Sequence, residues 1–124
     1  TIRTRGAKAG AALSPGTPVD AVSELLGDID FLTILAADPA IKEQPFMPRS
    51  VSKVRAAADV RAERGFDFAI QVEGGVSFDN LEELLRAGAD ILVAGSAIFQ
   101  SEDPRARLLE MIRVASEVRQ ASSV

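Results

Sequence analysis

The sequence contains no cysteine, histidine, tryptophan or tyrosine. Without cysteine there is no disulfide framework, no thiolate nucleophile and no zinc–thiolate site. The absence of histidine removes the most common metal ligand and the most common proton-transfer side chain. Any catalysis by this chain alone must therefore use carboxylates, lysine, hydroxyl groups or backbone groups.

Long apolar runs and excess positive charge are also missing. The 124 residues carry 14 Lys+Arg and 18 Asp+Glu, which gives a formal net charge of −4. A net negative charge provides no general attraction to nucleic acid or an anionic membrane. No run approaches the ~20 apolar residues that span a bilayer. Arg3 and Arg5 precede no apolar segment, so a signal peptide is not supported. We expect one cytoplasmic domain over residues 1–124, with no nucleic-acid or membrane partner.

Four segments of the chain repeat one pattern. An amphipathic stretch ends in glycine, a short apolar run follows, and a polar or Gly/Pro loop comes next. Glycine suits the residue after a helix because it adopts left-handed backbone angles without steric cost. Near-continuous apolar runs are typical of parallel strands that are buried on both faces. The glycines are Gly6, Gly27, Gly65 and Gly88, and the apolar runs are residues 8–13, 29–37, 66–72 and 89–94.

The expected helices have recognisable starts. Thr17 and Pro18 predict an N-cap and first helical residue, and a second helix is expected over residues 50–64. Ser77 can cap a third helix, with Val76 and Leu81 at hydrophobic-staple spacing. Asp103 and Pro104 open a long final helix, whose apolar positions Leu108, Met111, Ile112, Ala115 and Val118 follow helical spacing.

Alternating strands and helices predict an α/β fold with a parallel sheet. A small doubly wound sheet and part of a (β/α)₈ barrel are the two candidate architectures. A barrel of about 250 residues uses roughly 31 residues for each βα unit, so this chain matches about four units. This number of βα units favours half of a (β/α)₈ barrel over a small doubly wound sheet.

Polar residues at the carboxyl ends of parallel strands are the candidates for chemistry, whereas those at the strand starts are expected to be structural. Lys8, Asp30, Asp67 and Asp90 fall at strand starts. The carboxyl ends carry Ser14, Asp38, Glu73 with Gly74 and Gly75, and Gly95 with Ser96.

Two glycine loops follow successive strands. Glycine lets backbone N–H groups approach an anion closely, and residues 96–99 can form a short helix whose N-terminus points toward it. Simple tight turns are the alternative interpretation, but the paired loops favour a phosphate site formed by Gly74, Gly75, Gly95 and Ser96.

Glu73 is the best acid/base candidate, against the alternative of an exposed loop carboxylate. Asp38 is the second, although Asp38-Pro39 fits a simple turn equally well.

Three segments of the chain resemble ribulose-phosphate 3-epimerases, specifically their carboxyl-terminal half. They are residues 6–18 (GAKAGAALSPGTP), 71–76 (QVEGGV) and 89–99 (ADILVAGSAIF). The resemblance implies a (β/α)₈ barrel that interconverts D-ribulose 5-phosphate and D-xylulose 5-phosphate. In that family two aspartates act on opposite faces of C3, and two histidines and both aspartates hold a divalent metal such as zinc, iron, manganese or cobalt.

The chain departs from the family pattern at several positions. Glu73 aligns with the second aspartate and would be the one metal ligand on this chain, with its carboxylate displaced by one methylene. Residues 38–44 align with a glycine-rich loop that closes over the phosphate, but the glycines are gone. Asp38 and Lys42 are possible loop contacts, and Ser14 replaces an asparagine. The first four strands, with the other metal ligands, are absent.

Three functions remain open. The first is a divergent pentulose- or hexulose-phosphate 3-epimerase, an isomerase whose other half lies outside this chain. The second is a catalytically silent phosphosugar-binding relative, and the third is another phosphate-binding barrel enzyme.

Four strands cannot close a barrel, so both edge strands and the inner face would lack partners. We expect several of Ile34, Leu35, Ile70, Val72, Leu92 and Val93 to face water in an isolated monomer. The protein is then either a homo-oligomer or part of a longer chain; the helix-like residues 1–5 favour the longer chain.

Overall fold

The computed structural model describes residues 3–38 and 45–122. Its sheet contains four parallel strands in sequence order: β1 (Gly10–Leu13), β2 (Phe31–Leu35), β3 (Ala69–Glu73) and β4 (Ile91–Val93). This order confirms consecutive βα units. A doubly wound sheet reverses its strand order at a switch point, and these four strands show no reversal.

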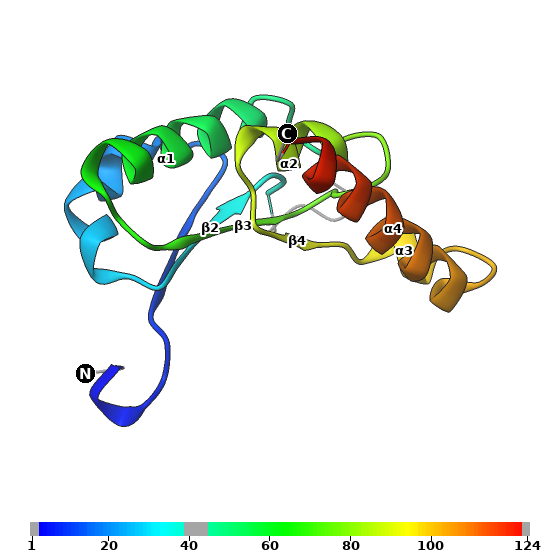
Figure 1. Cartoon of the computed structure of the whole chain (residues 1–124), viewed down its shortest axis with the longest axis horizontal. Coiled ribbons are helices and arrows are strands. Elements are labelled where there is room, and N and C mark those ends of the chain that lie inside the picture. Colours follow the sequence, from blue (N-terminus) through cyan, green and yellow to red (C-terminus); the bar gives the residue numbers. More distant parts are fainter. Residues whose placement is uncertain (1–2, 39–44, 123–124) are drawn as a thin grey trace.

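Apart from the short helix near the amino terminus, the helices lie on one side of the strands (Figure 1). They are the 3₁₀ helices η1 (Arg3–Arg5) and η2 (Val19–Asp28), and the α-helices α1 (Ser50–Arg64), α2 (Leu81–Ala87), α3 (Ser96–Phe99) and α4 (Pro104–Ser122). Neighbouring pairs are η2 with α1, α1 with α2, and α2 with α4. No helix in the described part of the chain is long and apolar enough to cross a bilayer.

Several predicted helix ends are confirmed. Gly65 follows α1 with φ +66°, and its N–H donates to the carbonyl of Arg61. Gly88 follows α2 with φ +122°. At the start of α4 the Asp103 carboxylate accepts a hydrogen bond from the Ala106 N–H at 3.1 Å. These caps satisfy backbone groups that helix ends leave without intrahelical partners.

The start of the third predicted helix is organised around Ser77, as expected. The Ser77 hydroxyl accepts from the Asp79 N–H at 3.3 Å, while the Asn80 side-chain oxygen accepts from the Ser77 N–H at 3.0 Å. The bond to Asn80 matches one half of a capping box, whereas the Ser77 hydroxyl accepts from Asp79 instead of Asn80. The regular α-helical segment begins four residues later, at Leu81.

The prediction for the first helix was wrong in three respects. The segment is a 3₁₀ helix rather than an α-helix, and it begins at Val19. Pro18 is the flanking residue, has extended backbone angles and makes no side-chain cap. Gly27 lies inside η2 instead of ending a helix. The Thr17 N–H donates to the Ser14 carbonyl, so Thr17 belongs to the turn after β1.

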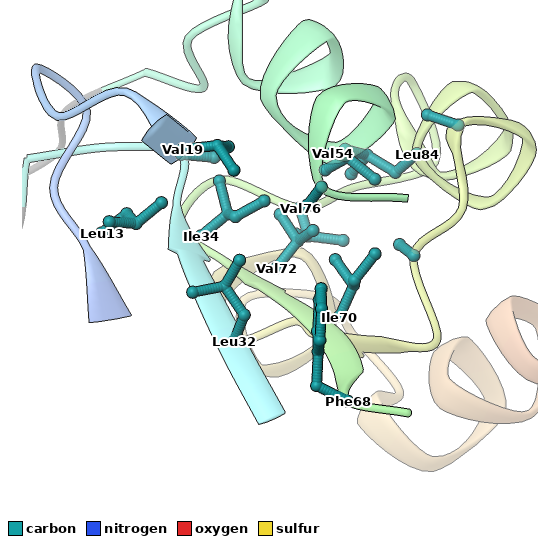
Figure 2. Packing of buried hydrophobic residues seen from close by; sticks show 14 of the residues in the cluster. Leu13, Val19, Leu32, Ile34, Val54, Phe68, Ile70, Val72, Val76 and Leu84 are labelled. Atoms are coloured by element: carbon teal, nitrogen blue, oxygen red, sulfur yellow. The ribbon is translucent and has the colours of Figure 1, made fainter. Parts of the chain in front are cut away.

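Helices pack against only one of the two faces of the sheet. Helix-facing side chains of β2 and β3 pack with Val54 and Leu84 in the core, as Figure 2 shows. Among the side chains expected to face water, Ile34, Ile70 and Val72 are fully buried in this layer, so that part of the prediction was wrong. Leu35 and Val93 alternate with them and lie on the opposite face, which no described helix covers.

Two aspartates at the strand starts connect neighbouring strands. The Asp30 carboxylate accepts from the Ala9 N–H at 2.7 Å, and the Asp90 carboxylate accepts from the Ile70 N–H at 2.9 Å. In both pairs the aspartate's own N–H donates back to the same residue's carbonyl. The expected structural role is confirmed for Asp30 and Asp90. Asp67 is exposed.

Candidate functional site

Glu73 is the last residue of β3 and lies on the uncovered face of the sheet. In the strand register its neighbours are Leu35 of β2 and Val93 of β4. The Glu73 carbonyl accepts from the Ala36 N–H at 2.7 Å, which fixes the backbone where the strand ends. The side chain is exposed. Its carboxylate is therefore accessible at the carboxyl-terminal edge of the sheet, where the sequence predicted it.

Gly74 and Gly75 form a tight turn against the end of β2. Their φ angles are +110° and +71°, values that side-chain-bearing residues rarely adopt. A Cβ on Gly74 would lie 2.8 Å from the Ala37 nitrogen, and a Cβ on Gly75 would lie 2.9 Å from the Phe46 nitrogen. Both positions therefore require glycine for internal reasons, whether or not an anion binds there.

Asn80 holds this turn in place. Its side-chain amide donates to the Gly75 carbonyl at 2.9 Å, while its oxygen caps the Ser77 N–H. Asn80 is buried, so both contacts are shielded from water. This residue was missed by the sequence analysis. The spacing Ser77-x-x-Asn80, which resembles a capping box, was the available signal.

Gly95 differs from the other two glycines. It precedes α3 with φ −110° and ψ −82°, and a Cβ placed on it would have no heavy atom within 4 Å. The short helix over residues 96–99 is present, as predicted. Its first N–H groups lack intrahelical partners by geometry and can serve an anion. Because β3 and β4 are adjacent, both glycine loops lie at neighbouring strand ends.

Asp38 follows β2, the strand next to β3. It lines a hollow of about 370 Å³ with Ser14, Pro15, Gly16, Met47 and Arg49, beside the carboxyl ends of β1 and β2. Lys42 lies outside the described residues. As functional contacts, Asp38 and Lys42 stay predictions.

Lys53 of α1 reaches the loop that follows β1. Its ammonium group donates to the Ser14 carbonyl at 3.0 Å and to the Pro15 carbonyl. Desolvation lowers the pKa of Lys53, and the nearby positive charge of Arg49 lowers the pKa further. The sequence gave no indication of this contact, because 39 residues separate Lys53 from Ser14.

Two polar side chains, Gln71 of β3 and Thr33 of β2, meet on the uncovered face of the sheet. Gln71 lies two residues before Glu73 along β3. The Gln71 side-chain amide donates to the Thr33 hydroxyl at 3.3 Å, and the two residues are in register on adjacent strands. Thr33 is only 6% exposed. The sequence analysis missed the pair, although alternation places Gln71 and Glu73 on the same face.

A divalent metal would need more ligands than this part of the chain provides. Within residues 3–38 and 45–122, no three side chains from His, Cys, Asp and Glu come together. Typical catalytic metal sites use three protein ligands. The residues present do not fit a complete metal site.

Solved structures establish the class of fold. A thiamine phosphate pyrophosphorylase from Pyrococcus furiosus aligns with 89% of this chain and 60% of its own, with a TM-score of 0.55 and 19% identity. A phosphonomutase, described as putative, from Burkholderia cenocepacia aligns with 96% of this chain and 73% of its own, with a TM-score of 0.51 and 14% identity. Together with the four parallel βα units, these similarities define a partial (β/α)₈ barrel.

Sequence comparison then identifies the family. Residues 1–99 match the profile of the ribulose-phosphate 3 epimerase family. A ribulose-phosphate 3-epimerase from Treponema pallidum is 42% identical over 98 residues, covering 79% of this chain and 45% of the relative. One from Mycobacterium leprae is 36% identical over 117 residues, covering 94% and 52%. The chain belongs to the ribulose-phosphate 3-epimerase family and spans about half the length of these curated relatives.

Proposed function

We propose that this chain supplies the phosphate-binding loops and one proton-transfer carboxylate of a ketose-phosphate 3-epimerase. The expected substrates are D-ribulose 5-phosphate and D-xylulose 5-phosphate, and the expected location is the cytoplasm. One observation carries the proposal. An exposed carboxylate, a glycine turn and a glycine–helix junction lie at the carboxyl ends of two adjacent strands.

The phosphate is assigned to backbone N–H groups of Gly75, Gly95 and Ser96, beside Gly74. Glycine leaves those N–H groups open to a ligand, and the start of α3 adds a favourable partial positive charge. Asn80 keeps the Gly75 turn ordered before the ligand arrives, which lowers the entropy cost of binding.

Glu73 is assigned the proton transfer at C3. Its carboxylate would take the proton from C3, and the electron pair left behind would delocalise into the neighbouring carbonyl as an enediolate. Return of a proton to the opposite face of C3 would invert that carbon. Glu73 serves one face only, so the second proton-transfer group must come from another part of the assembled barrel.

A divalent metal would stabilise negative charge on the enediolate oxygens when bound. Glu73 would be one of its ligands, and the remainder would lie outside the described residues.

Substitution of Gly95 by valine tests the phosphate loops. A Cβ at this position meets no protein atom within 4 Å, so the variant should fold normally and lose affinity for ribulose 5-phosphate because the side chain blocks backbone approach. Gly16→Val is the matched control, because a Cβ at Gly16 also has no atom within 4 Å. Amide chemical shifts during titration would report binding. Equal affinity in both variants would contradict the proposed phosphate site.

Exchange of the C3 proton with deuterated solvent tests Glu73. Glu73→Gln should abolish exchange while phosphate affinity is retained, because the amide cannot accept the proton. Phosphosugar binding without exchange in the wild-type assembled barrel, with divalent metal supplied, would instead indicate a catalytically silent relative. Exchange retained in Glu73→Gln would exclude the proposed role.

A further inference from the structure

The uncovered face of the sheet is apolar at most of its strand positions. Alternation along each strand places every second residue on this face. The polar side chains that the four strands place there are Thr33, Gln71 and Glu73, all on the two central strands. The remaining positions are apolar or glycine: Gly10 and Ala12 of β1, Phe31 and Leu35 of β2, Ala69 of β3, and Ile91 and Val93 of β4.

Thr33 and Gln71 form a hydrogen-bonded pair within this apolar surface. The Gln71 amide donates to the Thr33 hydroxyl at 3.3 Å, and Thr33 is only 6% exposed. Burial of polar groups costs free energy, and replacing both partners of such a bond by apolar groups of the same shape can be neutral or stabilising. The packing of this face therefore does not by itself account for the pair.

The Gln71 amide keeps hydrogen-bonding capacity beyond its bond to Thr33. A glutamine side chain has two N–H donors and one acceptor oxygen. Thr33 accepts from one donor, and no other group among the described residues bonds to the Gln71 side chain. Thr33 therefore fixes the orientation of the amide and leaves one N–H available on the face that also carries Glu73.

Glu73 is the next residue of β3 on the same face as Gln71. Alternate residues of a parallel strand are ~6.6 Å apart, a separation that two side chains of this length can bridge. The register neighbours of Glu73 are Leu35 and Val93, which offer no hydrogen-bonding side chain. The Glu73 carboxylate is exposed, and no group among the described residues donates to it. Proton transfer requires a carboxylate that is held in one direction.

We propose that Gln71 is a positioning residue for the Glu73 carboxylate. In the assembled barrel the second N–H of Gln71 donates to that carboxylate, while Thr33 holds the amide in the required orientation. This inference rests on the proposed function, because it assumes that Glu73 transfers the proton at C3. Gln71 itself neither exchanges a proton nor contacts the substrate. It restricts the carboxylate to the direction from which C3 is reached.

Replacement of both members of the pair separates a positioning role from a structural one. The double variant Thr33→Val with Gln71→Leu removes the polar groups and keeps similar side-chain volumes. Its midpoint of urea unfolding should equal or exceed that of the wild type. Its kcat for C3-proton exchange should fall about tenfold, because the carboxylate samples unproductive directions. KM for ribulose 5-phosphate should stay the same, because the phosphate loops are unchanged. An unchanged kcat would overturn the proposal.

The single variants test whether the two residues act through one contact. Thr33→Val and Gln71→Leu should each lower kcat, and the double variant should lose less than the product of the two losses. Thr33→Ser keeps the hydroxyl and should recover most of the rate that Thr33→Val loses. Gln120→Leu removes an amide from an exposed position of α4 and is the matched control. Equal losses in Thr33→Val and Thr33→Ser, or in Gln71→Leu and Gln120→Leu, would contradict the positioning role.

Nuclear magnetic resonance of the Gln71 side-chain amide tests the contact without turnover. In the isotope-labelled assembled barrel, Glu73→Ala should shift the Gln71 side-chain signals, because the acceptor is removed, and should not move those of Gln120. C3-proton exchange with an unshifted Gln71 signal leaves the proposed function standing and overturns the positioning role. A Gln71 signal that depends on Glu73, in a barrel that exchanges no C3 proton, leaves the contact standing and contradicts the proposed function.

Discussion

Asp90 is the residue whose removal should most clearly destabilise the amino-terminal side of the sheet. Its carboxylate accepts from the Ile70 N–H at 2.9 Å and forms an ion pair with Arg61 at 2.7 Å. A second guanidinium, from Arg119, lies at 3.4 Å. The Arg61 side chain also donates to the carbonyls of Phe68 and Gly88, so one cluster joins α1, α4 and the starts of two strands.

The expected cost of Asp90→Ala follows from these contacts. Leaving the N–H of buried Ile70 without an acceptor costs about 1–3 kcal/mol. The ion pair with Arg61 is partly exposed, with side chains 25% and 33% accessible, and adds at most about 1 kcal/mol. The sum is about 1–4 kcal/mol of unfolding free energy. Asp90→Asn retains an acceptor oxygen for Ile70 and should lose only about 1 kcal/mol.

Urea unfolding at fixed protein concentration measures the difference, since any dimerisation makes stability depend on concentration. Asp67→Ala is the matched control. Asp67 also comes just before a strand, but within the described residues its carboxylate makes no cross-strand hydrogen bond or ion pair, and its loss should change stability by less than about 0.5 kcal/mol. Equal effects of Asp67→Ala and Asp90→Ala would refute the argument that the cross-strand carboxylate bond stabilises the sheet.

Two further predictions concern Gly10 and Lys53. A Cβ on Gly10 would lie 2.2 Å from the Phe31 ring, so Gly10→Ala should cost about 1–3 kcal/mol in urea unfolding; no such penalty should appear in a Phe31→Ala background. The pKa of Lys53 is lowered in the folded chain, so between that lowered value and 10.5 the unfolded chain binds more protons. The stability of the wild type relative to Lys53→Met should therefore rise with pH across this window, and a flat difference between the two unfolding free energies would contradict the shift.

Local sequence signals predicted most of the elements because they act over a few residues. Gly65 ends α1 in the left-handed conformation, and Asp103 caps α4 through its own side chain. The order of strands and helices and the carboxyl-end placement of Glu73 also followed from sequence. η2 was the exception. The local pattern marked a helical segment there, but propensity does not distinguish a 3₁₀ helix from an α-helix when packing determines the form.

The tertiary structure decided which face of each strand is covered. Parallel strands are apolar on both faces, so their periodicity does not show that Ile34 and Val72 lie under the helices while Leu35 lies on the uncovered side. It also distinguished Asp30 and Asp90, whose carboxylates accept hydrogen bonds from a neighbouring strand, from Asp67, which makes no such bond within the described residues. These outcomes depend on strand register and contacts between distant segments. A local pattern of residues determines the type of an element, whereas the packing of that element against others determines what each side chain meets.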